Sequence, residues 1–267
     1  MKVNFLIIGA AKSATTSLSE ILSRHPEICF SQVKEPQFFS DPNWREHIDE
    51  YHSNFKEDAK IYGEASTNYS KRPLFNPNIC EDIYEYNPEM KIIYIMRHPI
   101  DRIISQYIHL YNRGYENSKD LDALILSNPN YLDTTRYAMQ ITPYISKFGR
   151  KNILFLFFED FISNPQKTAN AVHQFLNVET LQIDQKVINR NKSFDRRVIH
   201  YKYDDPKSFW SKLKKLGLIA KNYFNNDFID NKPIISEFTR DHILTELEDD
   251  ITTIEKITGK NLSDWRR

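Results

Sequence analysis

Apolar and polar positions alternate along the chain in a pattern that predicts three buried strands. The first apolar run covers Phe5 to Ile8 and ends at Gly9, the second covers Lys91 to Met96, and the third covers Ile153 to Phe158. Each run is short and almost unbroken, as is typical of strands that are covered on both faces of a parallel sheet. The pattern therefore predicts a buried sheet rather than a bundle of helices.

Helical periodicity appears after each of these strands and again near the end of the chain. The predicted helices run through Leu18, Ile21 and Leu22 to His25-Pro26, from about Ile100 to Asn112, from Thr134 to Phe148, from Asn164-Pro165 to about Leu176, and from Ser236 to Thr258 before Gly259. Short strands that alternate with helices indicate βαβ units. The sequence thus predicts an α/β fold with a parallel sheet.

The stretch at about 188–233 is the least regular part of the chain. It is polar, basic and aromatic, and its lysines cluster between Lys207 and Lys221 around Phe209 and Trp210. This cluster could face an acidic glycan, a membrane surface or only water. Because the sequence has no internal repeat and no low-complexity tract, we expect a single domain over residues 1–267 with this loop-rich variable segment.

Composition narrows the class of protein mainly by exclusion. With 40% hydrophobic and 13% aromatic residues among 267, the chain can build a large core and is neither disordered nor fibrous. Its 36 basic residues balance 36 acidic ones, so no overall field favours a nucleic-acid partner. Cys29 and Cys80 lack metal-ligand spacing, and no apolar stretch reaches the ~20 residues of a membrane span. We expect inert thiols, no transmembrane segment and a cytoplasmic location.

A glycine-started loop between the first strand and its helix is the strongest local signal. It runs from Gly9 to Ser17 and contains Lys12 and several hydroxyl side chains. Backbone N–H groups at a helix start attract anions, and the hydroxyls and the ammonium would converge on the same group. The loop indicates a phosphate or sulfate site, although taken alone a capped helix with a solvated lysine fits it equally well. It lacks the glycine directly before the lysine that nucleotide triphosphatase loops have.

A second candidate anion site follows the second strand. Arg97 comes directly after that strand, and the next helix carries Ser105 and His109. The planar fork of arginine suits a phosphate monoester, and a serine two turns into the helix can share it. Phosphoryl-transfer enzymes place a Mg²⁺-binding carboxylate at such a strand end, whereas here the strand ends in a cation. Two anion sites suit a donor with phosphates at both ends of its ribose. Surface ion pairing of Arg97 with Asp101, or of the nearby Arg102, is the weaker alternative.

These motifs, in this order, resemble the sulfotransferases that use 3′-phosphoadenosine 5′-phosphosulfate (PAPS), particularly the heparan sulfate N- and 3-O-sulfotransferase branch and its bacterial relatives. Lys12 to Ser17 is similar to the family's 5′-phosphosulfate loop, and Arg97 to Ser105 is similar to its 3′-phosphate motif. Further similar segments are Lys34 to Phe39, Gly63 to Tyr69, Phe157 to Phe161 with Asn164-Pro165, and Thr258 to Trp265. The resemblance covers nearly the whole chain and implies a P-loop-like three-layer fold, with a central parallel sheet flanked by helices.

The resemblance also implies an activity, which is transfer of the sulfuryl group from PAPS to a hydroxyl or amine of an acceptor, expected to be a carbohydrate. Lys12 would bind the 5′-phosphosulfate and stabilise the bridging oxygen, while Arg97 and Ser105 would hold the 3′-phosphate. The remaining loop positions of the donor site would be Ser13, Ala14, Thr15, Thr16 and Ser17. PAPS would be the co-substrate, its desulfated product PAP would be released, and no metal is implied.

The acceptor side is assigned by the same resemblance. Glu35 matches the glutamate that acts as general base, and Gln37 matches a neighbouring acceptor-side position. His109 matches a histidine near the reaction centre, although a packed histidine fits that helix face as well. Lys192 and Arg196 lie in the stretch that we expect to cover the cofactor.

Three positions depart from the family pattern. Ala14 replaces the usual glycine, a change that the loop tolerates if the backbone there has negative φ. Ala65 replaces a lysine after the glutamate that matches Glu64, so that one cation is absent and Lys34 is a candidate replacement. Cys29 and Cys80 are not placed to form the disulfide hairpin of the heparan branch.

Two other functions remain open on the sequence alone. A small-molecule kinase would need Mg²⁺ and ATP, and the missing glycine before Lys12 and the cation at the strand end speak against it. A non-catalytic module could bind anionic glycans through the cluster from Lys207 to Lys221. Selective binding of PAP without metal would separate the sulfotransferase from both.

Overall fold

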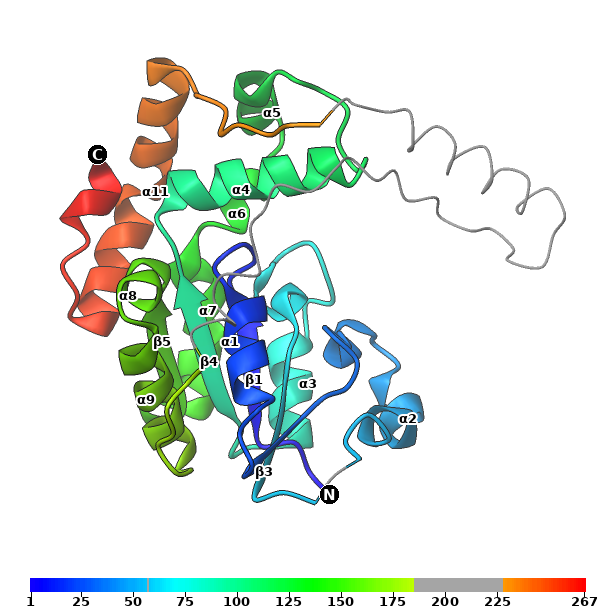
Figure 1. The fold of residues 1–267 in the computed structure, drawn as a ribbon. Helices are drawn as coiled ribbons and strands as arrows, with labels where there is room; N and C mark the ends of the chain where they lie inside the picture. Colours follow the sequence, from blue (N-terminus) through cyan, green and yellow to red (C-terminus); the bar gives the residue numbers. More distant parts are fainter. Residues whose placement is uncertain (57, 185–227) are drawn as a thin grey trace, which may run out of the picture.

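The fold is built on a five-stranded parallel sheet (Figure 1). The computed structural model describes residues 1–56, 58–184 and 228–267. The strands are β1 (Phe5–Gly9), β2 (Ile28–Phe30), β3 (Ile61–Ala65), β4 (Lys91–Met96) and β5 (Ile153–Phe157). Their order in the sheet is β2-β3-β1-β4-β5, so β1 lies between β3 and β4.

Two layers of helices cover the sheet, because the side chains of each strand alternate between its faces. Phe5 and Ile7 of β1 pack in one core with α1 (Thr15–Leu22) and α9 (Pro165–Leu176). Leu6 and Ile8 pack in a second core with helices that include α3 (Ile79–Tyr86) and α7 (Tyr137–Phe148). The predicted three-layer α/β fold is therefore confirmed.

The remaining helices surround these layers. They are α2 (Ile48–His52), α4 (Pro99–Asn112), α5 (Leu121–Ser127), α6 (Asn130–Asp133), α8 (Phe158–Ser163) and α11 (Glu237–Thr258). Short 3₁₀ turns are η1 (Phe38–Ser40), η2 (Trp44–His47), η3 (Thr67–Ser70), η4 (Arg150–Asn152) and η6 (Ser263–Arg266). Helix α4 lies across the end of the sheet towards which β4 points (Figure 1).

One predicted helix boundary is wrong. The helix expected from Thr134 begins at Tyr137, because the Thr134 hydroxyl donates to the carbonyl of Asn130 at 2.6 Å and so belongs to the end of α6. Arg136 then leaves the helical region, with ψ of 77°. The polypeptide therefore turns between α6 and α7 instead of continuing as one helix.

The strand order brings the two predicted anion-binding motifs to one edge of the sheet. β1 and β4 are neighbours in the sheet and run parallel, so the loop after Gly9 and the turn at Arg97 both lie at the carboxyl ends of the strands. Ligands of open α/β sheets bind outside the carboxyl ends of the strands, where the connections diverge to opposite sides. The connection after β1 leads to β2 and β3 on one side of it, whereas β4 and β5 lie on the other. The carboxyl ends of β1 and β4 are thus the expected position of a binding site.

Several sequence predictions concern features other than the sheet order. Among the described residues, no helix is long and apolar enough to cross a membrane, and no group of three or more potential metal ligands gathers. Cys29 and Cys80 are free and buried, and burial raises the pKa of the Cys80 thiol to about 12. Lys192, Arg196 and the cluster from Lys207 to Lys221 lie outside the described residues.

Candidate active site

The loop after β1 is shaped to present backbone N–H groups to an anion. Lys12 and Ala14 both have left-handed backbone conformations, with φ of 70° and 67°. Ala14 is the N-cap of α1 and has no side-chain oxygen to accept from the first turn. The first N–H groups of a helix have no partner within the helix, and an anion at this end of α1 could accept hydrogen bonds from them. The φ of Ala14 is positive, so the condition under which alanine fits this position without strain is not met: the turn into α1 places a left-handed residue there.

Close packing beneath the loop explains why it begins with glycine. A Cβ atom at Gly9 would lie 2.0 Å from the Ser70 hydroxyl and 3.0 Å from the Tyr94 ring. The Ser70 hydroxyl itself donates to the carbonyl of Ile8 at 2.6 Å. No side chain fits at position 9 unless the backbone moves. The start of the phosphate loop is thus packed against η3 and β4.

Two buried polar atoms at the site have no hydrogen-bond partner, and they fit an anion. The Ser13 hydroxyl and the Nε of Arg97 are both buried without a partner. Burial of an unpaired polar atom costs free energy, so such atoms in a native fold call for an explanation. A bound phosphate or sulfate would satisfy both, and this supports the donor assignment of Ser13 and Arg97.

Arg97 lies directly against the phosphate loop. Its Nη1 donates to the carbonyl of Lys12 at 3.2 Å, and its guanidinium carbon lies 4.3 Å above the ring of Phe158. The Tyr137 hydroxyl donates to the carbonyl of Arg97 at 2.7 Å and fixes the turn after β4. Arg97 forms no ion pair with any residue that the structure describes. Its charge is therefore available to a ligand beside Lys12.

The alternative of surface ion pairing around Arg97 is wrong. Asp101 pairs with Lys232 rather than with Arg97. Arg102 is fully buried and donates to the Thr135 hydroxyl, the Gln106 side chain and the carbonyl of Tyr131, at 2.9, 2.6 and 2.8 Å. Arg102 thus ties α4 to the segment around α6 and is not a surface residue.

Burial and neighbouring charge weaken the protonation of Lys12. Desolvation, and next the charge of Arg97, lower the pKa of Lys12 to about 8. The charges of Lys34 and Arg113 act in the same direction, and that of Glu35 opposes them. Lys12 therefore lies in a locally positive field that a bound anion would relieve.

Glu35 lies in a tight turn of the segment that precedes η1. Its φ is 52°, and Gln37, two residues later, has φ of 53°. The N–H of Gln37 donates to the Ser66 hydroxyl at 2.8 Å, which fastens this turn to the segment after β3. Among the described residues, none donates a hydrogen bond to the Glu35 carboxylate, and the side chain is half-exposed. Its charge opposes the lowering of the pKa of Lys12 and of Lys71, so Glu35 lies within electrostatic range of the phosphate loop.

His109 lies on α4 among several cations. Desolvation, and next the charge of Lys12, lower the pKa of His109 to about 4, with Arg113, Lys71 and Lys34 acting in the same direction. The imidazole is therefore neutral near pH 7. Ser105, one turn before it on α4, is buried. The structure thus brings Lys12, Arg97, Glu35 and His109 to one region and places Ser105 in the helix that borders it.

Glu64 is a strand-end carboxylate that bears on the kinase alternative. It lies in β3, next to β1, and is completely buried. Desolvation raises the pKa of Glu64 to about 8, and the hydroxyls of Ser66 and Tyr69 only partly offset this effect. The Glu64 carboxyl group is therefore mostly protonated near pH 7 when no metal ion is bound. The kinase alternative is tested by binding of ATP with Mg²⁺ rather than by this group.

Sequence reasoning missed two residues that border the site. Phe158 stacks on Arg97, and Lys71 acts electrostatically on both Glu35 and His109. Phe158 follows β5, the strand next to β4, so its position after an apolar run was a usable signal. Lys71 follows η3 and has no comparable local pattern.

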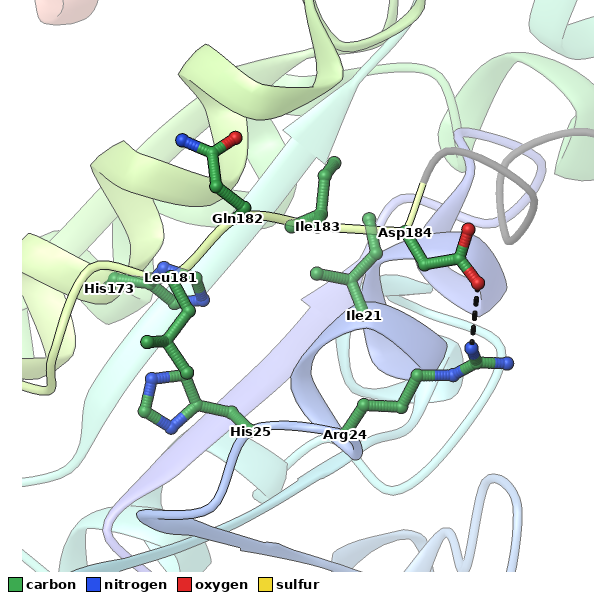
Figure 2. Close-up of a pocket in the computed structure, with 8 residues that line it drawn as sticks. All are labelled: Ile21, Arg24, His25, His173, Leu181, Gln182, Ile183 and Asp184. Atoms are coloured by element: carbon green, nitrogen blue, oxygen red, sulfur yellow. Dashed lines mark ion pairs between the residues drawn. The ribbon is translucent and has the colours of Figure 1, made fainter.

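A separate pocket lies at the opposite end of α1 from the phosphate loop (Figure 2). It measures about 170 Å³, and its walls include the rings of His25 and His173, which are tilted by 55° with centroids 4.8 Å apart. Arg24 and Asp184 form an ion pair of 3.6 Å at its edge. His25 follows the end of α1, as predicted, and its Nε2 is hydrogen-bonded to the carbonyl of Glu179 at 2.7 Å. None of the predicted site residues lines this pocket.

Comparison with known proteins agrees with the geometry. The chain is 25% identical over 254 residues to carbohydrate sulfotransferase 15 of Homo sapiens, covering 69% of this chain and 45% of that protein. It is 24% identical over 292 residues to bifunctional heparan sulfate N-deacetylase/N-sulfotransferase 1 of Mus musculus, covering 98% of this chain and 30% of that protein. The chain spans less than half the length of these relatives.

A solved structure has the same fold over the whole chain. The sulfotransferase from Alicyclobacillus acidocaldarius superposes with a TM-score of 0.71 at 24% identity, covering 100% of both chains. The sulfotransferase domain family itself matches residues 2–263. With a match of this extent and a fold and phosphate loop to go with it, the chain belongs to the sulfotransferase domain family.

Proposed function

We propose that the protein transfers the sulfuryl group of PAPS to a hydroxyl or amine of a carbohydrate acceptor, with Glu35 as general base. The proposal takes residues 1–267 as one domain. Membership of the family supports the reaction, and the names of the carbohydrate and heparan sulfate relatives support the acceptor class.

The donor would be held by the two anion sites at the carboxyl ends of β1 and β4. Lys12 and the N–H groups and hydroxyls from Ser13 to Ser17 would bind the 5′-phosphosulfate. Arg97 and Ser105 would bind the 3′-phosphate. Lys192 and Arg196 remain candidates for the cover of this site. PAPS supplies an activated sulfuryl group, so the chain itself needs to form no covalent intermediate.

The transfer step requires a base on one side of the sulfur and a cation on the other. The Glu35 carboxylate would accept the proton of the acceptor hydroxyl or amine as the new S–O or S–N bond forms. The bond between sulfur and the bridging oxygen breaks, and its electron pair stays on the phosphate of PAP. Lys12 would stabilise the charge that develops on that oxygen. The neutral imidazole of His109 can donate one hydrogen bond and accept another at the site without adding positive charge.

One observation carries the proposal: the two anion-binding motifs meet. Arg97 Nη1 donates to the Lys12 carbonyl at 3.2 Å, and the buried Ser13 hydroxyl and Arg97 Nε both lack a hydrogen-bond partner. The experiment that tests it is calorimetric titration with PAP in the absence of metal, beside ATP with Mg²⁺. We expect selective binding of PAP, with affinity reduced about 10- to 100-fold in Arg97→Ala because a charge-assisted contact is lost.

Arg24→Ala is the matched control, because Arg24 is an exposed arginine at the other end of α1. It should bind PAP as the wild type does. Tighter binding of ATP with Mg²⁺ than of PAP would contradict the proposal and favour a small-molecule kinase. Binding of neither ligand would favour a non-catalytic module.

The acceptor class is tested separately by the transfer of ³⁵S from labelled PAPS. We would compare N-desulfated heparin and chondroitin with a simple phenol as acceptors. Label on the glycans supports a carbohydrate acceptor, and label on the phenol alone contradicts it.

For location, we retain the cytoplasm. The buried free thiols of Cys29 and Cys80 support a reducing compartment. Fractionation of source cells, followed by immunoblotting, would test this assignment.

A further inference from the structure

Beside the candidate base, Gln37 ends a chain of three hydrogen-bonded side chains, and its other two members, Asn68 and Lys71, have no role in the proposed reaction. Lys71 Nζ donates to Asn68 Oδ1 at 2.8 Å, and Asn68 Nδ2 donates to Gln37 Oε1. Asn68 is buried, whereas Gln37 and Lys71 are half-exposed. The chain therefore runs from the segment after β3 to the turn that carries Glu35.

Each member of this chain fixes the orientation of the next. An ammonium group has only donors, so Asn68 must turn its carbonyl oxygen towards Lys71. The Asn68 NH₂ then faces Gln37, which must offer its own oxygen in return. The Gln37 NH₂ is left as the free end, because it donates to none of the residues that the structure describes. One cation thus sets the direction of two amides, neither of which has a directional preference of its own.

The turn around Gln37 is held firmly enough for this orientation to matter. The backbone N–H of Gln37 donates to the Ser66 hydroxyl, and that of Phe39 donates to the Tyr69 hydroxyl at 3.3 Å. Ser66, Asn68 and Tyr69 are all buried in the segment that follows β3. Because the backbone is fixed on both sides, the remaining freedom is that of the Gln37 side chain, and its hydrogen bond with Asn68 restricts that freedom.

We propose that Lys71 and Asn68 are positioning residues that hold Gln37 with its NH₂ towards the acceptor, where it donates to an acceptor oxygen beside the group that Glu35 deprotonates. The inference rests on the proposed function for the identity of the acceptor side. It makes Gln37 a specificity-determining residue, because only an acceptor that presents a hydrogen-bond-accepting oxygen at this position would satisfy it.

The isosteric variant Asn68→Asp gives the sharpest test, because it keeps the shape of the three side chains and is expected to reverse the orientation of the Gln37 amide. A carboxylate at position 68 would accept from Lys71 and from the Gln37 NH₂, and the Gln37 oxygen would then face the acceptor. In the ¹⁵N spectrum of side-chain amides, the Gln37 pair is identified by its loss in Gln37→Glu. We expect the Gln37 NH₂ of Asn68→Asp to exchange with water about 10-fold more slowly than in the wild type, because it now donates to a charged group.

Lys71 is tested in the same spectrum. Lys71→Met should shift the amide signals of Asn68 and Gln37, and Lys71→Arg, which retains a cationic donor, should restore them. Lys147→Met is the matched control, since Lys147 is a surface lysine that pairs with Glu81 at 3.4 Å. It should leave both amides unchanged. PAP titration of every variant reports whether the fold and donor site are intact.

Activity provides the second measurement. With the glycan that accepts ³⁵S most efficiently, kcat/KM for the acceptor should fall about 10- to 100-fold in Asn68→Asp and equally in Gln37→Glu, because an acceptor oxygen then meets another acceptor. Affinity for PAP should stay within about twofold of the wild type, and Lys71→Arg should recover most of the loss of Lys71→Met.

The inference is overturned if the Gln37 signals of folded Asn68→Asp match those of the wild type, or if Lys71→Arg fails to restore them. It is also overturned if Asn68→Asp keeps wild-type kcat/KM while Gln37→Glu loses it. The spectra are recorded without acceptor or donor. A wild-type protein that transfers no sulfuryl group would therefore count against the proposed function and leave the hydrogen-bond chain to be decided by the spectra.

Discussion

Lys12 should make donor binding sensitive to pH. Its pKa is lowered to about 8, so the ammonium begins to lose its proton just above neutral pH in the free protein. A bound anion favours the charged form and raises the pKa in the complex. The contribution of Lys12 to binding is thus fully present below about pH 8 and is lost as pH rises through the higher pKa of the complex. We expect calorimetric affinity for PAP to fall between about pH 7.5 and 10.

Lys12→Arg provides the comparison, because a guanidinium stays charged over this whole range. The variant should show a much flatter affinity between the same pH limits. An equally steep fall in Lys12→Arg would assign the pH dependence to another group.

Ala14 should cost the protein some stability in return for the shape of the loop. Its left-handed φ of 67° is unfavourable for a residue with a Cβ atom. Ala14→Gly should raise the free energy of unfolding by about 1 kcal/mol, since relief of this strain outweighs the added entropy of the unfolded chain. Urea unfolding measures the change. A loss of stability would mean that packing of the methyl group outweighs the strain.

At the residue scale, the sequence predicts those site residues that stand at fixed offsets from a strand end. Lys12 lies three residues after β1 and Arg97 directly follows β4, so the local pattern is enough to locate them. Phe158 contacts Arg97 only because β5 pairs with β4, and Lys71 reaches Gln37 only through Asn68. These contacts depend on the tertiary arrangement, and a single sequence does not contain them as a pattern.

Between elements, the first turn of α8 supports the arginine that follows β4. The Phe158 ring lies under the Arg97 guanidinium at 4.3 Å, and Glu159 accepts a hydrogen bond from the N–H of His98 at 2.8 Å. Phe158→Leu should weaken PAP binding about 3- to 30-fold, because the guanidinium loses a cation–π contact that holds its orientation. Calorimetric titration measures the loss.

Phe155→Leu is the matched control for this element. Phe155 lies in the same strand-to-helix segment and stacks with Arg150 at 4.6 Å, a contact that involves none of the candidate site residues. It should leave PAP affinity unchanged. Equal losses in the two variants would point to a general weakening of β5 rather than to support of Arg97.

The strands that were predicted correctly are those with a nearly unbroken apolar run. β1, β4 and β5 are such runs. β2 has three residues, and β3 is interrupted by Gly63 and Glu64, so neither gives a strand pattern. Gly63 is required because a Cβ there would lie 2.2 Å from the Phe5 ring, and Glu64 is a buried carboxyl group beside the site. The sequence pattern thus fails to predict β3, because packing against Phe5 requires a glycine in this strand and a buried carboxyl group takes the place of an apolar residue.

For the whole molecule, the sheet order turns separate motifs into one site. Because β1 lies between β3 and β4, the phosphate loop, the segment from Ser66 to Lys71 and the turn at Arg97 all border the same edge. The parallel sheet and its two helical layers were predictable from alternation of strands and helices, whereas the strand order was not.

Binding at this edge should stabilise the entire fold, since the site draws on three strands. A ligand that binds only the native state at 100 times its dissociation constant adds about 2.7 kcal/mol to the free energy of unfolding. For a chain of this size, PAP should then raise Tm by about 5–10 °C. Thermal unfolding with and without PAP measures the shift. The absence of any shift at saturating PAP would argue that this edge does not bind the donor.

The most direct test of the account is the initial rate of ³⁵S transfer from PAPS to a glycan acceptor by Glu35→Gln, beside the exposed-glutamate control Glu46→Gln. The account predicts that Glu35→Gln loses a factor of about 10² to 10⁴ in turnover and keeps wild-type affinity for PAP, because a general base is removed and the donor site is left intact. Glu46→Gln should transfer at the wild-type rate. Wild-type turnover by Glu35→Gln would contradict the assignment of Glu35 as the base.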